Sequence, residues 1–227
     1  KDQSRDVRLA AVNTLLRVVN SGREEAISAM GDCLEDSDHR VRAAACEALP
    51  QLSSVFDNRL ITQAMDRMSS IHAVVREVAV KVLASVTTRG SPVVIEGMCK
   101  AVGDVDPQVK TTAMVELTKQ VDSGNADVIQ LIVEQLRDPR PNVRRTAASC
   151  LESLVVKGDK VALLSIFGVM DDPGKDQYGH LAVQVSALRA LQIIAAQETR
   201  DTFSPRTEAK MFSSIVDKIT SPDWCVR

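Results

Sequence analysis

The chain has 227 residues, 44% hydrophobic and 26% charged, with a formal net charge of −2. Nucleic-acid-binding proteins usually carry a basic stripe that replaces counterions on phosphates, so this balance predicts no nucleic-acid partner. No run of about 18 apolar residues is present, so we expect no membrane insertion. Aromatic residues make up only 3% of the chain, although a large globular core normally uses more of them. Thin layers of closely approaching helices fit this composition better.

The cysteines are odd in number and never form a C-x-x-C pair. This pattern fits free thiols in a reducing compartment better than a disulfide framework. We therefore expect an intracellular, cytoplasmic protein whose thiols are small hydrophobic groups within helices. The residues concerned are Cys33, Cys46, Cys99, Cys150 and Cys225.

A short pattern repeats along the chain with a period of 34 residues over its first five copies. Each copy has a valine, an alanine four positions later and a leucine eight positions later. The valines are Val7, Val41, Val75, Val109, Val143 and, after a spacing of 40, Val183. Because offsets 0, 4 and 8 share one stripe of an α-helix, each copy predicts a helix with a buried face. We expect these helices to begin near residues 5, 39, 73, 107, 141 and 181.

A second apolar segment precedes each of these helices, and glycines mark the turns between units. Gly22, Gly90, Gly124 and Gly158 share one register, in which Phe56 is the exception. A glycine just after a helix adopts the left-handed conformation that ends it. Asp106-Pro107 places a capping residue before a proline at a helix start. The unit is therefore a pair of helices, and the fold class is all-α, with about six helix-pair repeats of 34 residues.

The turns between paired helices carry an aspartate and then Val-Arg, as in Asp36 to Arg42 and Asp138 to Arg144. This pattern resembles the HEAT repeat family, including the shorter HEAT-like repeats of phycobilin lyases. The resemblance implies a right-handed α-α superhelix, or solenoid, with a ladder of ion pairs between neighbouring units. Ser70 and Gln184 depart from the pattern. The expected ladder residues are Asp2, Arg8, Asp36, Arg42, Arg76, Asp104, Lys110, Asp138 and Arg144.

The chain is expected to be a single solenoid segment over residues 1–227, part of a longer chain, because neither end shows a polar cap. Residues 171–205 form an irregular repeat with longer loops. Within them, the stretch 171–180 gathers acidic residues and a histidine that could hold a cation, but no glutamate closes a calcium loop. We favour a solvated loop and expect no metal site. The residues concerned are Asp171, Asp172, Asp176 and His180.

No constellation of catalytic residues is evident. The HEAT-type enzyme deoxyhypusine hydroxylase holds iron with repeated His-Glu pairs, whereas none of the three histidines here precedes a glutamate. His39 and His72 occupy corresponding turns and are expected to be solvent-exposed. We therefore predict a protein that is not an enzyme, with no catalytic residues and no cofactor.

The outward positions of the repeated helices, two and six residues after each valine, mix apolar groups with charges of both signs. In HEAT-type stacks these helices line the concave surface, and a mixed strip suits a protein or peptide partner. We predict a scaffold or adaptor, and membership of a larger assembly is left open as an option. A HEAT-like lyase or chaperone-type enzyme component and a nucleic-acid-binding helical repeat are the alternatives. The candidate contact residues are Asn13, Glu47, Glu77, Lys81, Thr111, Val115, Arg145, Ser149 and Arg189.

Overall fold

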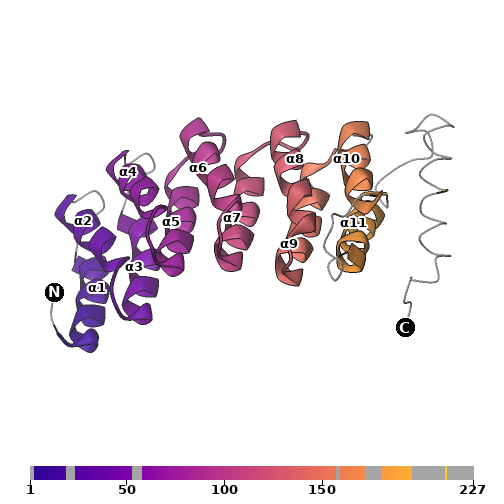
Figure 1. Ribbon diagram of the computed structural model, residues 1–227. Coiled ribbons are helices and arrows are strands. Elements are labelled where there is room, and N and C mark those ends of the chain that lie inside the picture. The colour runs from indigo at the N-terminus through magenta and orange to yellow at the C-terminus, as the bar shows by residue number, and fades with distance from the viewer. Residues whose placement is uncertain are drawn as a thin grey trace. The chain divides into compact units, whose positions relative to one another are not determined.

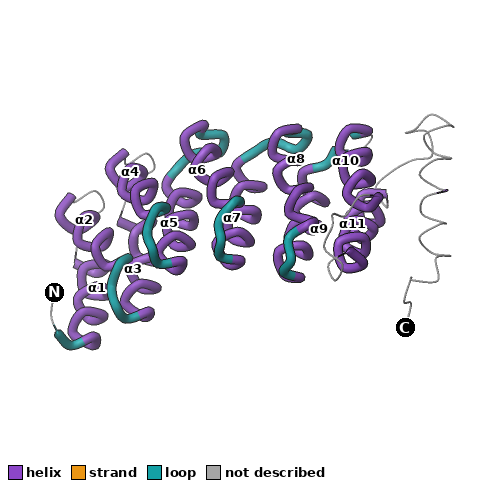
Figure 2. The backbone as a smooth tube through the Cα atoms, viewed as in Figure 1, coloured by secondary structure: helices purple, strands orange, loops and turns teal. Residues whose placement is uncertain are grey.

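The computed structural model describes residues 3–18, 24–52, 58–156, 159–171 and 180–195, together with residue 213. Within these ranges the regular structure is entirely helical, and no strand is present (Figure 2). None of the described helices is long and apolar enough to cross a membrane. The chain divides into two compact units, residues 1–121 and 122–227, each of which is described by itself.

The helices alternate as the 34-residue period predicts. We name the two helices of each pair the first helix and the second helix, in chain order. The second helices are α1 (Arg5–Val18), α3 (His39–Leu52), α5 (Ala73–Val86), α7 (Pro107–Gln120), α9 (Pro141–Leu154) and α11 (His180–Ala195). The first helices are α2 (Glu24–Cys33), α4 (Asn58–Arg67), α6 (Pro92–Val102), α8 (Ala126–Glu134) and α10 (Lys160–Asp171). A short 3₁₀ helix, η1 (Gln135–Arg137), follows α8. Every second helix begins within one residue of its predicted start, so the helix-pair architecture is confirmed.

The valine, alanine and leucine stripe forms the core in five of the six second helices. In α3, α5, α7, α9 and α11 these side chains are at most 7% exposed. In α1, by contrast, Val7 is 50% exposed and Ala11 is also exposed. The described residues contain no first helix before α1, so that side of the stripe has nothing to pack against. The buried stripe thus depends on a complete pair of helices.

Unit 1 consists of two layers of helices (Figure 1). The second helices α1, α3, α5 and α7 lie side by side in one layer, each in contact with the next. The first helices α2, α4 and α6 form the other layer, and each packs against the second helix of its own repeat. The core lies between the layers, where alanines such as Ala79 and Ala113 allow helices to approach closely.

Unit 2 repeats this arrangement with fewer described helices. The first helices α8 and α10 contact each other, and so do the second helices α9 and α11. Within each repeat, α8 packs against α9 and α10 against α11. Its core includes Ile132, Leu151 and Ile166, all fully buried.

The turns after the second helices connect neighbouring repeats. Gly90 and Gly124 have positive φ angles of 87° and 85°, as their places after a helix predict. The N–H of Gly90 donates to the carbonyl of Gln120 at 2.9 Å, and that of Gly124 to the carbonyl of Leu154 at 2.7 Å. Each glycine therefore caps the end of the second helix one repeat further on. The corresponding residues 22, 56 and 158 lie outside the described residues.

The assignment of the two faces of α7 can be tested with a pair of neighbouring substitutions. Leu117 is fully buried, so Leu117→Ala should lower the free energy of unfolding by about 2–5 kcal/mol. Val115 is 39% exposed, so Val115→Ala should cost well under about 1 kcal/mol. Chemical denaturation of both variants measures the difference. Equal losses at the two positions would show that the face assignment is wrong.

Candidate functional site

The turns within the helix pairs of unit 1 are joined by arginine–aspartate pairs between successive repeats. Arg8 donates from Nε and Nη2 to the two carboxylate oxygens of Asp36, both at 2.8 Å. Arg76 does the same to Asp104 at 2.7 and 2.8 Å. In both pairs the partners are 28 residues apart. This two-pronged geometry is the strong, directional form of an arginine–carboxylate contact.

Arginines at this position of the repeat also hold the turn of their own repeat. Nη1 of Arg76 donates to the carbonyls of Ser70 and Ile71 at 2.8 and 3.3 Å. Nη1 of Arg144 donates in the same way to the carbonyls of Asp138 and Pro139, at 2.8 and 2.9 Å. The arginine of a repeat therefore fixes the start of its own second helix. Where the next repeat supplies an aspartate partner, the same arginine also fixes the turn of that next repeat.

The aspartates complete the arrangement by folding their own turns. Asp36 accepts a hydrogen bond from the N–H of Asp38 at 2.9 Å, and Asp104 accepts one from that of Asp106 at 2.8 Å. Asp106 in turn caps α7 by accepting from the N–H groups of Gln108 and Val109, as the sequence predicts. Each ladder aspartate thus shapes the backbone that leads into the second helix.

The ladder arginines Arg42 and Arg144 make different contacts. Among the described residues, Arg42 donates hydrogen bonds only to the carbonyls of its own turn. Serine stands at position 70, where the ladder pattern has an aspartate. Nε of Arg144 donates to Ser186 Oγ at 3.2 Å. A Lys110–Asp138 pair would join the two units and stays a prediction. Asp2 lies outside the described residues.

The ladder shifts the proton affinity of its members. The guanidinium of Arg76, through its hydrogen bonds, holds the pKa of Asp104 below its usual value, against the opposing effect of burial. The same hydrogen bond raises the pKa of Arg76. The side chains of this pair are only 13% and 11% exposed. Both groups therefore remain charged, and their attraction is shielded from solvent better than that of an ordinary surface pair.

Most of the candidate contact residues of unit 1 are exposed on the layer of second helices. One position per repeat, six residues after the valine, is exposed on each of α1, α3, α5 and α7. Thr111 is half-buried. These exposed positions are occupied by Asn13, Glu47, Lys81 and Val115.

Glu77 differs from the other candidates because neighbouring side chains engage its carboxylate. One carboxylate oxygen of Glu77 lies 2.7 Å from Nζ of Lys81 and accepts a hydrogen bond from Thr112 Oγ1 at 3.1 Å. The Nε2 of Gln108 donates to the same oxygen at 3.4 Å. Glu77 therefore links α5 to α7. Helical periodicity predicts which way Glu77 points, but it does not reveal what the next helix places there.

In unit 2 the candidates Arg145 and Ser149 are exposed on α9, and Arg189 is exposed on α11. Val185, on the same helix as Arg189, is also exposed. Neither arginine forms an ion pair with any described residue. The second-helix layer of unit 2 thus presents positive charge beside an apolar side chain.

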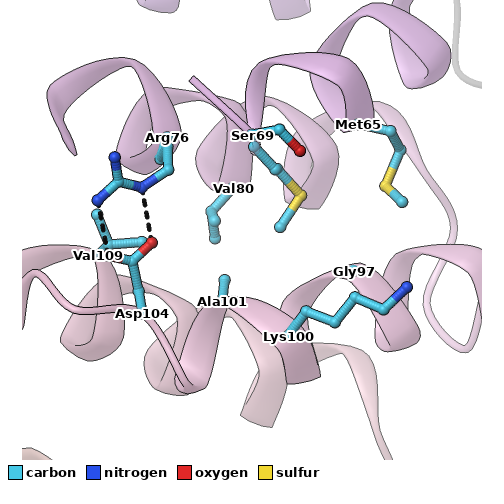
Figure 3. A pocket seen from close by; sticks show the side chains of 10 residues that line it. Met65, Ser69, Arg76, Val80, Gly97, Lys100, Ala101, Asp104 and Val109 are labelled. Atoms are coloured by element: carbon cyan, nitrogen blue, oxygen red, sulfur yellow. Dashed lines mark hydrogen bonds and ion pairs between the residues drawn. The ribbon is translucent and has the colours of Figure 1, made fainter. Parts of the chain in front are cut away.

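A cavity of about 210 Å³ lies in unit 1 among α4, α5, α6 and α7. Met65, Met68 and Ala101 line it, and the Arg76–Asp104 pair closes one end (Figure 3). Gly97 makes room here, since a Cβ at this position would lie 2.9 Å from the sulfur of Met65. No sequence pattern indicated this cavity, because Gly97 occurs inside a helix, away from any turn signal.

The remaining candidates are the histidine, cysteine and acidic side chains that could bind a metal ion or act as reactive groups. No group of three or more histidine, cysteine or acidic side chains there is arranged to hold a metal ion. His39 and His72 are exposed, as expected for turn residues. Burial raises the pKa of the Cys150 thiol to about 12, so this thiol stays protonated. Residues 172–179, the centre of the acidic loop, and 196–205 lie outside the described residues.

The ladder predicts a specific loss of stability in acid. Because the folded pKa of Asp104 is lowered, its contribution is present above the unfolded value of about 3.9 and is lost as pH falls through the folded value. Wild type should therefore lose more free energy of unfolding than Asp104→Asn between about pH 5 and pH 2.5. Chemical denaturation across that range measures this. Parallel pH profiles for the two proteins would contradict the assignment.

Comparison with known proteins agrees with this geometry. The family model described as HEAT repeats matches residues 1–84, and the model described as HEAT repeat matches residues 128–157. A search of curated protein sequences gave no significant match.

Two of the solved structures that the chain resembles are named as repeat proteins. A designed armadillo repeat protein matches with a TM-score of 0.46 and 14% identity, over 86% of this chain and 96% of its own. An archaeal HEAT-like repeat protein from Thermococcus onnurineus NA1 matches with a TM-score of 0.47 and 16% identity, over 85% of this chain and 84% of its own. From its 34-residue helix pairs, its arginine–aspartate turns and the two family matches, the chain belongs to the HEAT repeat family.

Proposed function

We propose that this chain is a non-catalytic interaction scaffold that binds a peptide or protein segment on its layer of second helices. The observation that carries the proposal is the regular exposure of one side chain per repeat in unit 1. An extended partner that lies across the second helices would meet these positions one after another.

The chemistry of these positions favours a protein partner. Asn13, Glu47, Lys81 and Val115 supply an amide, both signs of charge and an apolar contact. A nucleic acid would require a run of cations and aromatic surfaces for stacking, and these positions offer neither. A mixed set of this kind suits the alternating side chains of a polypeptide, with paired charges setting orientation and register.

The proposed surface can be tested by site-specific photo-crosslinking in cells. A photoreactive amino acid at Val115 should form adducts with a partner, because this side chain is 39% exposed on the second-helix layer. The matched control is Val93, which is 54% exposed on the first helix α6. Adducts formed from Val93 and not from Val115 would place the binding surface on the other layer and contradict the proposal.

A charge reversal tests the same surface by a different route. The double substitution Glu47→Lys and Lys81→Glu should weaken capture of the crosslinked partner at least tenfold, because both complementary charges become repulsive. Lys81→Glu also removes the pair with Glu77, but an i,i+4 pair of this kind contributes only about 0.3–0.5 kcal/mol, and both substituted side chains are exposed, so the fold should be retained. Unchanged affinity with an unchanged circular dichroism spectrum would show that these side chains do not contact the partner.

A further inference from the structure

The ladder of unit 1 is interrupted between its second and third repeats. In the 28-residue register that joins Arg8 to Asp36, the partner of Arg42 is Ser70. Arg42 keeps two hydrogen bonds to carbonyls of its own turn, at 2.7 and 2.9 Å. Its Nε, however, is buried and has no hydrogen-bond partner among the described residues. Burying a hydrogen-bond donor without an acceptor costs free energy. This junction therefore lacks the acceptor that an aspartate supplies in the other two arginine–aspartate contacts, each of which we call a rung of the ladder.

Ser70 preserves one part of the aspartate's role and lacks the other. Its Oγ accepts a hydrogen bond from the N–H of His72 at 3.3 Å, as the ladder aspartates accept from the residue two positions later. The serine hydroxyl therefore still shapes the turn into α5. It carries no negative charge and has no second oxygen for a guanidinium. The missing component is an anion on residue 70.

Neighbouring second helices of unit 1 are in least extensive contact at this same junction. Helices α3 and α5 contact each other less extensively than α1 and α3, or α5 and α7. The two closer pairs are those whose turns are joined by Arg8–Asp36 and Arg76–Asp104. The junction without an arginine–aspartate contact is thus also the junction at which the second helices are in least extensive contact.

We propose that Ser70 is a phosphorylation site and that its phosphate completes the ladder by binding Arg42. Phosphoserine carries a charge of about −1.5 to −2 at pH 7 and offers three acceptor oxygens, which a guanidinium binds with two parallel hydrogen bonds. These oxygens lie one bond further from the backbone than those of aspartate. The long arginine side chain, fixed here only through Nη1, can accommodate that difference.

The modifying reaction is phosphoryl transfer from magnesium-bound ATP by a protein kinase. Ser70 Oγ forms a bond to the γ-phosphorus, the bond from that phosphorus to the bridging oxygen breaks, and ADP leaves. The hydroxyl proton passes to a carboxylate of the kinase. Arg67, three residues before Ser70, supplies a positive charge of the kind by which many kinases select substrates.

Arg67 does not compete for the phosphate in the folded chain. Its guanidinium faces Asp32 and Glu35 of the preceding repeat, at 3.6 and 3.7 Å. Both acidic side chains are more than half exposed, whereas the Arg67 side chain is only 13% exposed and also donates to the carbonyl of Gln63 at 3.2 Å. A kinase that reads Arg67 must therefore displace these contacts. Arg42 remains the cation that the ladder register places opposite residue 70.

Phosphorylation would act on the surface proposed above for binding. Glu47 lies on α3 and Lys81 on α5, so the spacing of these helices sets the spacing of the two charges. A rung between Arg42 and a phosphorylated Ser70 would fix that spacing. This consequence rests on the proposed function, whereas the modification site and its effect on stability do not.

The structural part of the proposal is tested by incorporating phosphoserine at position 70 through an expanded genetic code. The thermal unfolding midpoint should rise by roughly 2–4 °C relative to the unmodified chain. Arg42→Gln should abolish the rise, whereas Arg8→Gln, which removes an equivalent ladder arginine, should leave it intact. No rise with Arg42 present, or an equal rise in Arg42→Gln, overturns the proposal. Ser70→Asp compared with uncharged Ser70→Asn repeats the test without a phosphate.

The modification itself is tested with a serine/threonine kinase that requires arginine three residues before the acceptor, together with magnesium and ATP. Mass spectrometry of the purified chain should place a phosphate on Ser70, and Ser70→Ala should remove it. Thr62, which follows Arg59 with the same spacing but lies within helix α4, is the internal control. A chain modified at Thr62 and not at Ser70, or left unmodified, overturns the assignment.

Discussion

The arginine–aspartate contact between successive repeats is the constraint that organises two of the three junctions between second helices in unit 1. A single guanidinium fixes the turn that starts its own second helix and, through two further hydrogen bonds, the turn of the next repeat. Because both partners are largely removed from water, their geometry must be exact to offset the cost of desolvation. The rung therefore sets the 28-residue register, and with it the height at which one second helix lies against the next.

The other end of each second helix is held by a different device. Gly90 and Gly124, with positive φ angles, turn their N–H groups to the last carbonyls of the neighbouring second helix. Between these two ends, small side chains such as Ala79 and Ala113 let the helices approach closely. A core built in this way needs few aromatic residues. Stability is then distributed over the contacts between neighbouring repeats, as in other solenoids, and one altered rung has a local effect.

The helical architecture could be predicted from the sequence because each repeat carries its own evidence. The starts of the second helices and their buried stripes follow from offsets that recur in every copy. Exceptions appear where a side chain depends on a neighbouring repeat. Val7 is exposed because no described first helix covers it. The carboxylate of Glu77 accepts hydrogen bonds from Gln108 and Thr112 of the next second helix. The cavity beside Gly97 likewise depends on the placement of Met65 in another repeat. The periodicity of apolar residues predicts the buried face of a single helix. It does not predict which side chains of two different repeats meet.

The most direct test of this account is a double-mutant cycle on Arg76 and Asp104. Arg76→Met, Asp104→Asn and the double variant would be compared with wild type by chemical denaturation. The account predicts a coupling energy of about 1.5–3 kcal/mol, as expected for hydrogen bonds between charged and partly buried groups. The same cycle on Arg42 and Ser70, with Ser70→Ala, should give a value near zero. If the effects of the two substitutions at Arg76 and Asp104 simply add, to within about 0.5 kcal/mol, the ladder does not hold the repeats together.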